Sequence, residues 1–323
     1  MKTLDQVEPR TPITNVPYEI TAPGSYYLSG SFTGSAGTTG ITINASGVTL
    51  DLCGHALVGV TGSADGISVK AGRRTIAIRN GTVSHWGGDG VNAGATSVNN
   101  VQVEDLLSIT NGGAGIRVNS LSAVLRCQAS ENNGSGIIGS GISILVKDCV
   151  ASINKFDGIN LPTSSSVIDC TARDNFDDGI VLAGGAYVAG CSSVANDAAG
   201  IVVTGPGSTV VNCSIAASGQ EGLRVGSETY VLNNNVDQSG SGGVNANILV
   251  TSSGNRIEAN HAIGGDIGIS VQSNRNFVIR NTAGGSLSGT NFQIVAGNFA
   301  GPINNVSAGG TITNLNPWAN FEY

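Results

Sequence analysis

The chain has 323 residues, of which 48 are glycine, and charged residues make up only 11% of it. Its formal net charge of -7 argues against binding to nucleic acid, and it disfavours a polyanionic polymer unless calcium or a local basic patch compensates. No segment reaches 18 consecutive apolar residues, so no transmembrane helix is predicted.

Residues 1–40 are predicted to form an N-terminal arm and cap. Bulky side chains such as Tyr26, Tyr27 and Phe32 gather there, as expected of a group that covers the end of a repeat array. The first residues lack the apolar stretch of a signal peptide. We expect a secreted or cell-surface protein whose signal peptide has been removed, with a cytoplasmic location as the alternative.

Residues 41–285 are periodic. A glycine followed by an aliphatic residue recurs at intervals of 21 to 25 residues, and this fixed period predicts one structural unit stacked on itself. The glycines of these pairs are Gly66, Gly90, Gly115, Gly136, Gly158, Gly179, Gly200, Gly222, Gly243 and Gly268.

Three other residue types keep the same phase as the glycine, four, nine and twelve positions before it. They are Asn111, Asn132, Asn154, Asn175 and Asn196; Cys127, Cys149, Cys170, Cys191 and Cys213; and Val124, Val146, Val167, Val188 and Val210. The asparagines are expected in turns, bonded to neighbouring backbone and able to adopt the left-handed conformation. Stacked in register, the cysteines point the same way, so we expect buried free thiols rather than disulfides.

Apolar residues alternate within each unit, which predicts short strands separated by turns of Gly, Asn, Asp and Ser. The predicted architecture is an all-β, single-domain parallel β-helix of roughly ten coils. The period fades after Arg280, and residues 286–323 are predicted to form a C-terminal cap or tail, in which Trp318, Phe321 and Tyr323 plug the last coil or pack on its flank.

These columns resemble the right-handed parallel β-helix, pectate-lyase-like superfamily over about residues 40 to 285. The units Asn154-Lys-Phe-Asp-Gly-Ile-Asn-Leu161 and Asn175-Phe-Asp-Asp-Gly-Ile-Val-Leu182 carry the resemblance, together with the opening segment Pro23-Gly-Ser-Tyr-Tyr-Leu28. The resemblance implies a single-stranded right-handed β-helix. It also implies a polysaccharide-active enzyme or a non-catalytic solenoid, because the fold hosts lyases, epimerases, hydrolases and adhesins.

Acidic residues recur at the position directly before the repeat glycine. Asp157 and Asp178 lie there in adjacent coils, about one strand spacing apart, and Asp177 adds a third carboxylate. Close like charges push carboxyl pKa values apart, as acid–base chemistry requires, and three carboxylates could also hold calcium. The alternative is ordinary turn chemistry, since Asp65 and Asp89 occupy the same position in other coils.

A lyase or C5-epimerase acting on a uronic-acid-containing glycan is the first function predicted. Such an enzyme must remove the C5 proton and neutralise the substrate carboxylate, and Lys155 and Arg173 are the candidate base and neutralising cation beside an Asp-bound calcium. A glycoside hydrolase with paired aspartates is the second, because Phe156-Asp157-Gly158 and Asp177-Asp178-Gly179 resemble polygalacturonase segments. The Gly-His-Gly and Arg-Ile-Lys motifs of that family are missing, and a non-catalytic binding solenoid is the third prediction.

Further side chains are candidates for substrate binding. Two of them, Arg117 and Arg224, occupy the second position after a repeat glycine, where a side chain should point outward. A tryptophan beside a groove can stack on a sugar ring, although in a loop it is as often a packing plug. The substrate-binding candidates are Arg117, Asn160, Arg224, Glu221, Trp86 and His85. The predicted partner is a polysaccharide, and no oligomeric state is predicted.

Overall fold

The structure, a computed structural model, describes residues 10–240, 245–309 and 311–323. In these ranges every regular element is a β-strand. The chain divides into two compact units, Met1–Pro162 and Thr163–Tyr323. Each unit is a parallel β-helix, which confirms the predicted fold class. The single domain and the limits of its two caps stay predictions; residues 1–9 of the predicted arm and the predicted pair Gly243-Val244 lie outside the described residues.

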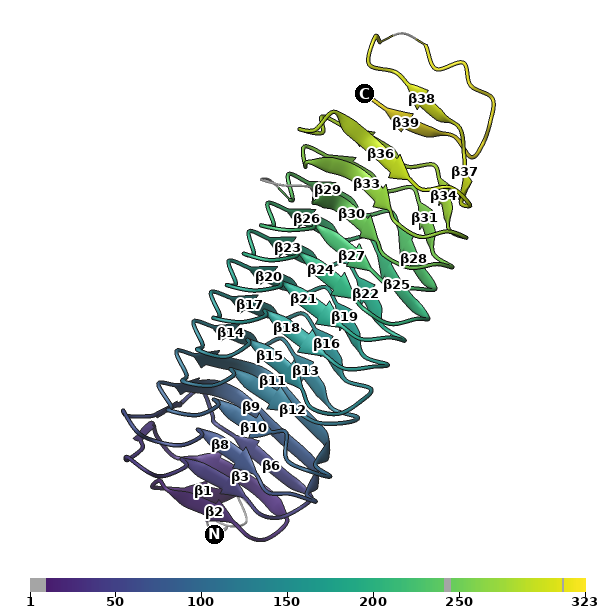
Figure 1. Ribbon diagram of the computed structural model, residues 1–323. Coiled ribbons are helices and arrows are strands. Elements are labelled where there is room, and N and C mark those ends of the chain that lie inside the picture. The colour runs from purple at the N-terminus through teal and green to yellow at the C-terminus, as the bar shows by residue number, and fades with distance from the viewer. Residues whose placement is uncertain (1–9, 241–244, 310) are drawn as a thin grey trace. The chain divides into compact units, whose positions relative to one another are not determined.

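Seven short strands of the first unit pair in parallel, each with its equivalent in the next coil, and form what we call the first ladder (Figure 1). Six of them begin directly after a glycine. The strands are β2 (Tyr18–Ile20), β5 (Ile41–Ile43), β8 (Ile67–Val69), β10 (Val91–Ala93), β12 (Ile116–Val118), β15 (Ile137–Gly139) and β18 (Ile159–Leu161).

The remaining strands of the first unit complete each coil with a second and a third ladder. The 11-residue strands β9 and β11 run through both ladders, whereas in later coils two short strands replace them. The strands are β1 (Thr11–Ile13), β3 (Gly24–Leu28), β4 (Phe32–Thr33), β6 (Val48–Asp51), β7 (Ala56–Val58), β9 (Arg74–Ser84), β11 (Asn99–Ile109), β13 (Ala123–Leu125), β14 (Gln128–Ser130), β16 (Leu145–Lys147) and β17 (Val150–Ser152).

The second unit repeats this plan. Its first ladder consists of β21 (Ile180–Leu182), β24 (Ile201–Val203), β27 (Leu223–Val225), β30 (Ala246–Val250), β33 (Ile267–Val271) and β36 (Thr290–Ile294). Its second ladder consists of β19 (Ser166–Ile168), β22 (Tyr187–Ala189), β25 (Ser208–Val211), β28 (Thr229–Leu232), β31 (Arg256–Glu258), β34 (Phe277–Ile279) and β37 (Phe299–Ala300). Its third consists of β20 (Thr171–Arg173), β23 (Ser192–Val194), β26 (Ser214–Ala216), β29 (Asn235–Asp237), β32 (His261–Ile263), β35 (Thr282–Gly284), β38 (Ile303–Asn305) and β39 (Asn320–Glu322).

The described residues contain more coils than the roughly ten predicted, with seven first-ladder strands in the first unit and six in the second. Three of these strands lie outside the counted glycine series. Strand β5 follows a further Gly-Ile pair at Gly40, whereas β2 and β36 begin at Tyr18 and Thr290 without such a pair. The strand can also recur without its glycine: by register, Asn247 in β30 and Asn291 in β36 take the place of Gly222 and Gly268 in the preceding coils.

A ladder of buried asparagines joins successive coils. In the first unit, the backbone N–H and the side-chain amide of Asn111 both donate to Oδ1 of Asn132, each at 3.0 Å. Asn132 donates in the same way to Asn154, and in the second unit Asn175 donates to Asn196. Positive φ values are found at the preceding residues, such as Glu131 (57°), and not at the asparagines, so the expected left-handed backbone is displaced by one position.

A second asparagine ladder reaches the tail. In the second unit it runs through Asn234, Asn260 and Asn281 and ends on Asn320, which accepts from the backbone N–H of Asn281 at 3.0 Å. Strand β39, which carries Asn320, pairs with β35 as another coil would. The five column cysteines are free and buried, as predicted. A side-chain hydrogen bond with Cys149 and burial raise the pKa of Cys127.

Candidate active site

Carboxylates before the repeat glycine bind the backbone of the next coil. In the first unit, Asp65 accepts from the backbone N–H of Asp89 at 2.9 Å, and Asp89 accepts from that of Ala114 at 2.6 Å. In the second unit, Asp178 accepts from Ala199 N–H at 2.7 Å. The position therefore has a structural task wherever one of these carboxylates occupies it, because each satisfies a backbone donor that neighbouring strands leave unpaired.

Asp65 and Asp89 each have a second partner, the outward side chain two positions after the repeat glycine of the next coil. In the first unit, Asn92 donates to Asp65 at 2.9 Å. Arg117 forms an ion pair with Asp89, with 2.6 Å between Nε and Oδ2, and this hydrogen bond raises the pKa of the guanidinium. The charge of Arg117, a candidate for substrate binding, is thus already balanced by a buried carboxylate.

A different balance of charges surrounds Asp178 in the second unit. Burial raises the pKa of this carboxyl above its usual value, although its hydrogen bond with Ala199 N–H acts in the opposite direction. The negative charges of Asp177 and Glu221 raise the pKa further, and the positive charge of Arg224 lowers it. Four charged side chains of this unit are therefore close enough to influence one another.

Glu221 and Arg224 form a loose pair beside Asp178. Glu221 is 8% exposed, and its Oε2 has no hydrogen-bond partner among the described residues. Nη1 of Arg224 lies 3.9 Å from that oxygen, too far for a hydrogen bond. Arg224 occupies the middle of β27, where its side chain is 38% exposed. Its guanidinium is therefore less firmly held than that of Arg117 and more accessible to an anionic group.

Two of the predicted catalytic residues, Lys155 and Asp157, belong to the first unit. Asp157 precedes β18 and accepts a hydrogen bond from Asn160 in the middle of that strand, at 2.6 Å. Lys155 is exposed in the turn before it. The predicted proximity of Asp157 to Asp177 and Asp178 rests on the period of the sequence and stays a prediction.

Arg173 lies apart from the first ladder of the second unit. It ends β20 of the third ladder, is exposed, and forms an ion pair with Asp174 at 3.1 Å. Its role as a catalytic base or cation is untested.

Trp86 and His85 differ sharply in exposure. Trp86 is 1% exposed, and its indole Nε1 donates to the carbonyl of Leu57 at 3.1 Å. A Cβ on Gly40 would lie 2.7 Å from the indole ring, so the tryptophan fits there because residue 40 is a glycine. In this position Trp86 packs inside the first unit and presents no face to a sugar. His85 is exposed, with a φ of 61°.

The architecture of the two units agrees with the match to a known family. Each unit is a parallel β-helix whose outward first-ladder face carries acidic and basic side chains. The family model described as "Right handed beta helix region" matches residues 39–192 and 162–314. The chain belongs to the right-handed β-helix family. A comparison with curated proteins gives no significant match. None of the described segments forms a long apolar helix that could cross a bilayer.

Solved structures share this fold at low sequence identity. The A-module of the mannuronan C-5 epimerase AlgE4 of Azotobacter vinelandii is 18% identical, with a TM-score of 0.73 over 84% of this chain and 89% of that module. The AlgE6 A-module of the same organism is 19% identical, with a TM-score of 0.73 over 93% and 89%. The periplasmic alginate epimerase AlgG is 10% identical, with a TM-score of 0.51 over 81% and 77%.

Proposed function

We propose that the chain acts on a uronic-acid-containing polysaccharide at C5 of the sugar, as a lyase or a C5-epimerase. The observation that carries the proposal is the pairing of two unlike groups in the second unit. Asp178 is a carboxyl whose pKa is raised by burial, and Arg224 is a guanidinium close enough to lower it. Glu221 and Asp177 complete the group.

Both reactions start with removal of the C5 proton. That proton becomes more acidic when a cation neutralises the neighbouring carboxylate of the sugar, which is the task we give to Arg224. A carboxylate with a raised pKa is a stronger base than an ordinary one, which is the task we give to Asp178. Return of a proton to the opposite face completes epimerisation. Departure of the oxygen at C4 completes elimination and leaves an unsaturated sugar.

The other predicted site residues enter as part of the proposal. The repeat period gives Asp157 the same phase as Asp178 one coil earlier, with Lys155 nearby in the turn. Calcium prefers six to eight oxygen ligands, so Asp177 and Asp178 alone are too few. A calcium site would need Asp157, water and the substrate as well. Calcium dependence is tested by comparing activity and thermal stability in calcium with those in a chelator.

Fold similarity supports a polysaccharide substrate and directs the choice of the first one tested. Two of the similar structures are named mannuronan C-5 epimerases, and each covers more than four fifths of this chain. We therefore place polymannuronate first and polygalacturonate second. A secreted or cell-surface location goes with such substrates and is part of the same proposal.

The test follows the fate of C5. The protein is incubated with polymannuronate or polygalacturonate in D2O, and the product is read by proton NMR and by ultraviolet absorbance. Both reactions remove the C5 proton, but only epimerisation leaves deuterium at that carbon in an intact chain, and only elimination produces the absorbance of an unsaturated uronate. Neither signal on any uronate polymer would overturn the proposal.

Substitutions locate the site. Asp178→Asn keeps an oxygen for Ala199 N–H but removes the base, and Arg224→Gln removes the cation, so each should lower kcat at least a hundredfold. Asp197→Asn is the matched control, because Asp197 is exposed in the turn of the following coil. Asp65→Asn alters the same coil position in the first unit and should leave activity unchanged. Full activity in Asp178→Asn would place the chemistry elsewhere.

A hydrolase is the second candidate. A carboxyl whose pKa is raised by burial can remain protonated and give its proton to a glycosidic oxygen, while a second carboxylate such as Asp177 serves as base or nucleophile. New reducing ends, without absorbance and without deuterium at C5, would identify this reaction.

A further inference from the structure

A row of exposed aromatic side chains crosses the second unit on a ladder that the proposed active site does not use. It lies on the outer face of the second ladder, at the residue directly before each inward-pointing side chain. Paired strands place its six positions in register, one coil apart. We call it the aromatic stripe, and its members are Tyr187, Thr209, Tyr230, Arg256, Phe277 and Phe299.

The aromatic members are exposed although they are large and apolar. Tyr187 is 43% exposed, Tyr230 53%, Phe277 46% and Phe299 59%. Tyr187, Tyr230 and Phe277 each lie on a short strand whose next residue is buried. Single exposed aromatics are ordinary, but four aligned on one ladder form a row of the kind that marks a binding site.

The spacing of the stripe is specific. Tyr187, Tyr230 and Phe277 lie on alternate coils, so successive rings are separated by about two strand spacings, or ~9.6 Å. Thr209 and Arg256 occupy the coils between them and offer hydrogen-bonding groups. The repeat of the fold is one coil, and it does not by itself require that aromatic and polar residues alternate.

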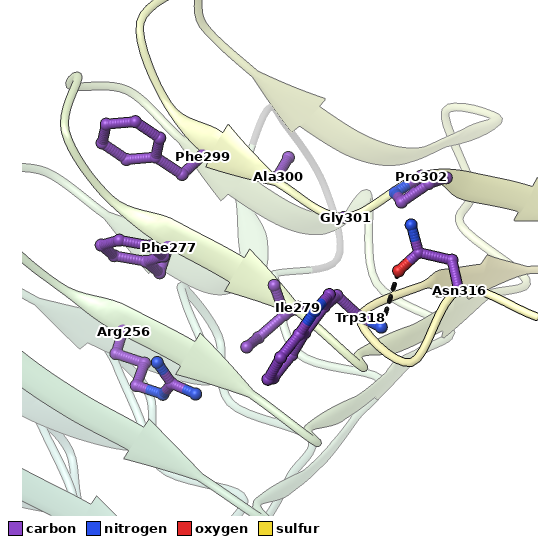
Figure 2. A pocket seen from close by; sticks show the side chains of 9 residues that line it. All are labelled: Arg256, Phe277, Ile279, Phe299, Ala300, Gly301, Pro302, Asn316 and Trp318. Atoms are coloured by element: carbon purple, nitrogen blue, oxygen red, sulfur yellow. Dashed lines mark hydrogen bonds between the residues drawn. The ribbon is translucent and has the colours of Figure 1, made fainter.

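The C-terminal end of the stripe opens into a cavity of about 400 Å³. Figure 2 shows Arg256, Phe277 and Phe299 one above another on neighbouring strands, with Trp318 on the other side of the cavity. The rings of Phe277 and Phe299 are stacked, with centroids 4.9 Å apart. Arg280 lies over one face of Trp318, 4.6 Å from the ring centre. Stacking surfaces therefore continue from the stripe into the cavity.

Charge along the stripe is nearly absent. Arg256 is its single charged member, and its Nε donates to Glu258 at 2.6 Å. Glu258 also binds Arg280 at 2.9 Å. An anionic polymer would meet one guanidinium that already has a carboxylate partner, on a chain whose net charge is -7. The stripe thus suits an uncharged occupant.

We propose that the aromatic stripe binds an uncharged, extended β-1,4-linked glycan of the cellulose or chitin type, separately from the proposed uronate site. In such a chain each sugar is turned over relative to the one before it, so the same face returns at every second sugar. One pyranose unit is close in length to the spacing of neighbouring strands. Sugars could therefore stack on Tyr187, Tyr230 and Phe277, while hydroxyls between them reach Thr209 and Arg256.

The test measures adsorption of the full chain to microcrystalline cellulose and to chitin, with cellohexaose and chitohexaose as soluble competitors. Tyr230→Ala and Phe277→Ala should each weaken adsorption about tenfold, the loss expected when an aromatic anchor is truncated. Phe277→Trp should retain it. Phe277→Leu should behave like Phe277→Ala, because leucine keeps apolar bulk but has no ring to stack.

Two controls separate the stripe from other surfaces. Phe176→Ala removes an aromatic of the same unit that is 59% exposed but lies outside the stripe, and should leave adsorption unchanged. Asp178→Asn should also adsorb normally, so failure of the proposed C5 chemistry and failure of this inference are distinguishable. Circular dichroism confirms that each variant is folded, and Phe299→Ala replaces any that is not.

Three results would overturn the inference. The wild-type chain could fail to adsorb to either glycan, or Phe277→Leu could adsorb as well as wild type. Light scattering could instead show a wild-type oligomer that Phe277→Ala dissociates while adsorption is unchanged. In that last case the stripe is covered by a second copy of the chain.

Discussion

At the scale of single residues, the same carboxylate can close a turn and provide chemistry. Asp65 and Asp89 each bind a backbone N–H of the next coil and an outward side chain. Asp178 binds Ala199 N–H in the same way, but its surroundings raise its pKa. What distinguishes Asp178 is the set of charges around it, and not its place in the repeat.

This difference predicts a pH dependence of stability. Because burial raises the pKa of Asp178 in the folded state, the unfolded chain, with a carboxyl pKa near 3.8, releases the proton first as the pH rises. Below the pKa of the unfolded chain, Asp178 is protonated in both states and does not affect stability. As the pH rises from there through the higher pKa of the folded state, ionisation of Asp178 increasingly destabilises the fold. Asp178→Asn should gain stability relative to wild type between pH 3 and pH 7, measured by urea unfolding. A constant difference across that range would contradict the raised pKa.

The sequence could not separate these roles for a physical reason. A capping carboxylate and a catalytic one are both Asp before Gly, and only burial and neighbouring charge distinguish them. Arg117 and Arg224 likewise share a phase, yet one has a partner at 2.6 Å and the other at 3.9 Å. Trp86 could be a sugar platform or a packing plug from its position in the sequence, and its surroundings decide that it is buried.

At the scale of elements, the asparagine ladders tie short strands into coils. Each strand of the first ladder has only three to five residues, too few to fix its register alone. Each asparagine accepts from the backbone and side chain of the preceding one, so the amides keep successive turns in line. The repeating columns made this part of the fold predictable, because a residue that bonds its own equivalent must recur in every coil.

Removing one rung tests the ladder. Asn132→Ala leaves the buried backbone N–H of Asn111 without its acceptor and removes a side chain that bonds Asn154, so unfolding should become easier by about 3 kcal/mol. Asn133→Ala is the matched control, because that neighbour is exposed, and it should change stability by less than about 0.5 kcal/mol. Chemical denaturation measures both. Equal effects of the two substitutions would show that the ladder contributes little.

The aromatic stripe is visible in the sequence only as a phase, not as a repeated residue type. Tyr187 stands directly before Val188, a member of the valine column, so its phase was visible in the sequence. Its members differ in chemistry, with Thr209 and Arg256 between the rings, so the column has no repeated identity. A search for repeated identity finds the inward residues, which must fit one another. Outward residues recur at the same place in each coil but need not be of the same type, so such a search does not find them.

At the scale of the whole molecule, most contacts link a coil to its neighbours, so its length should be adjustable in whole coils. Deleting residues 180–200 joins Gly179 to Ile201 and preserves every inward and outward position in the second unit. We expect this variant to fold with an unchanged circular dichroism spectrum per residue. Deleting residues 180–190 shifts the following strands out of phase and should give an unfolded or aggregated product. Similar behaviour of both deletions would contradict modular stacking.

The asparagine ladders also have a direction. Each rung donates toward the C-terminus, from Asn111 to Asn132 and from Asn234 to Asn260, so a coil at the growing end always presents donors to the one that follows. A chain that emerges from a ribosome or an export channel with its N-terminus first would meet these requirements in the order in which they arise. Each new coil would then complete the hydrogen bonds of the one before it, so the coils would dock one at a time in the order of synthesis.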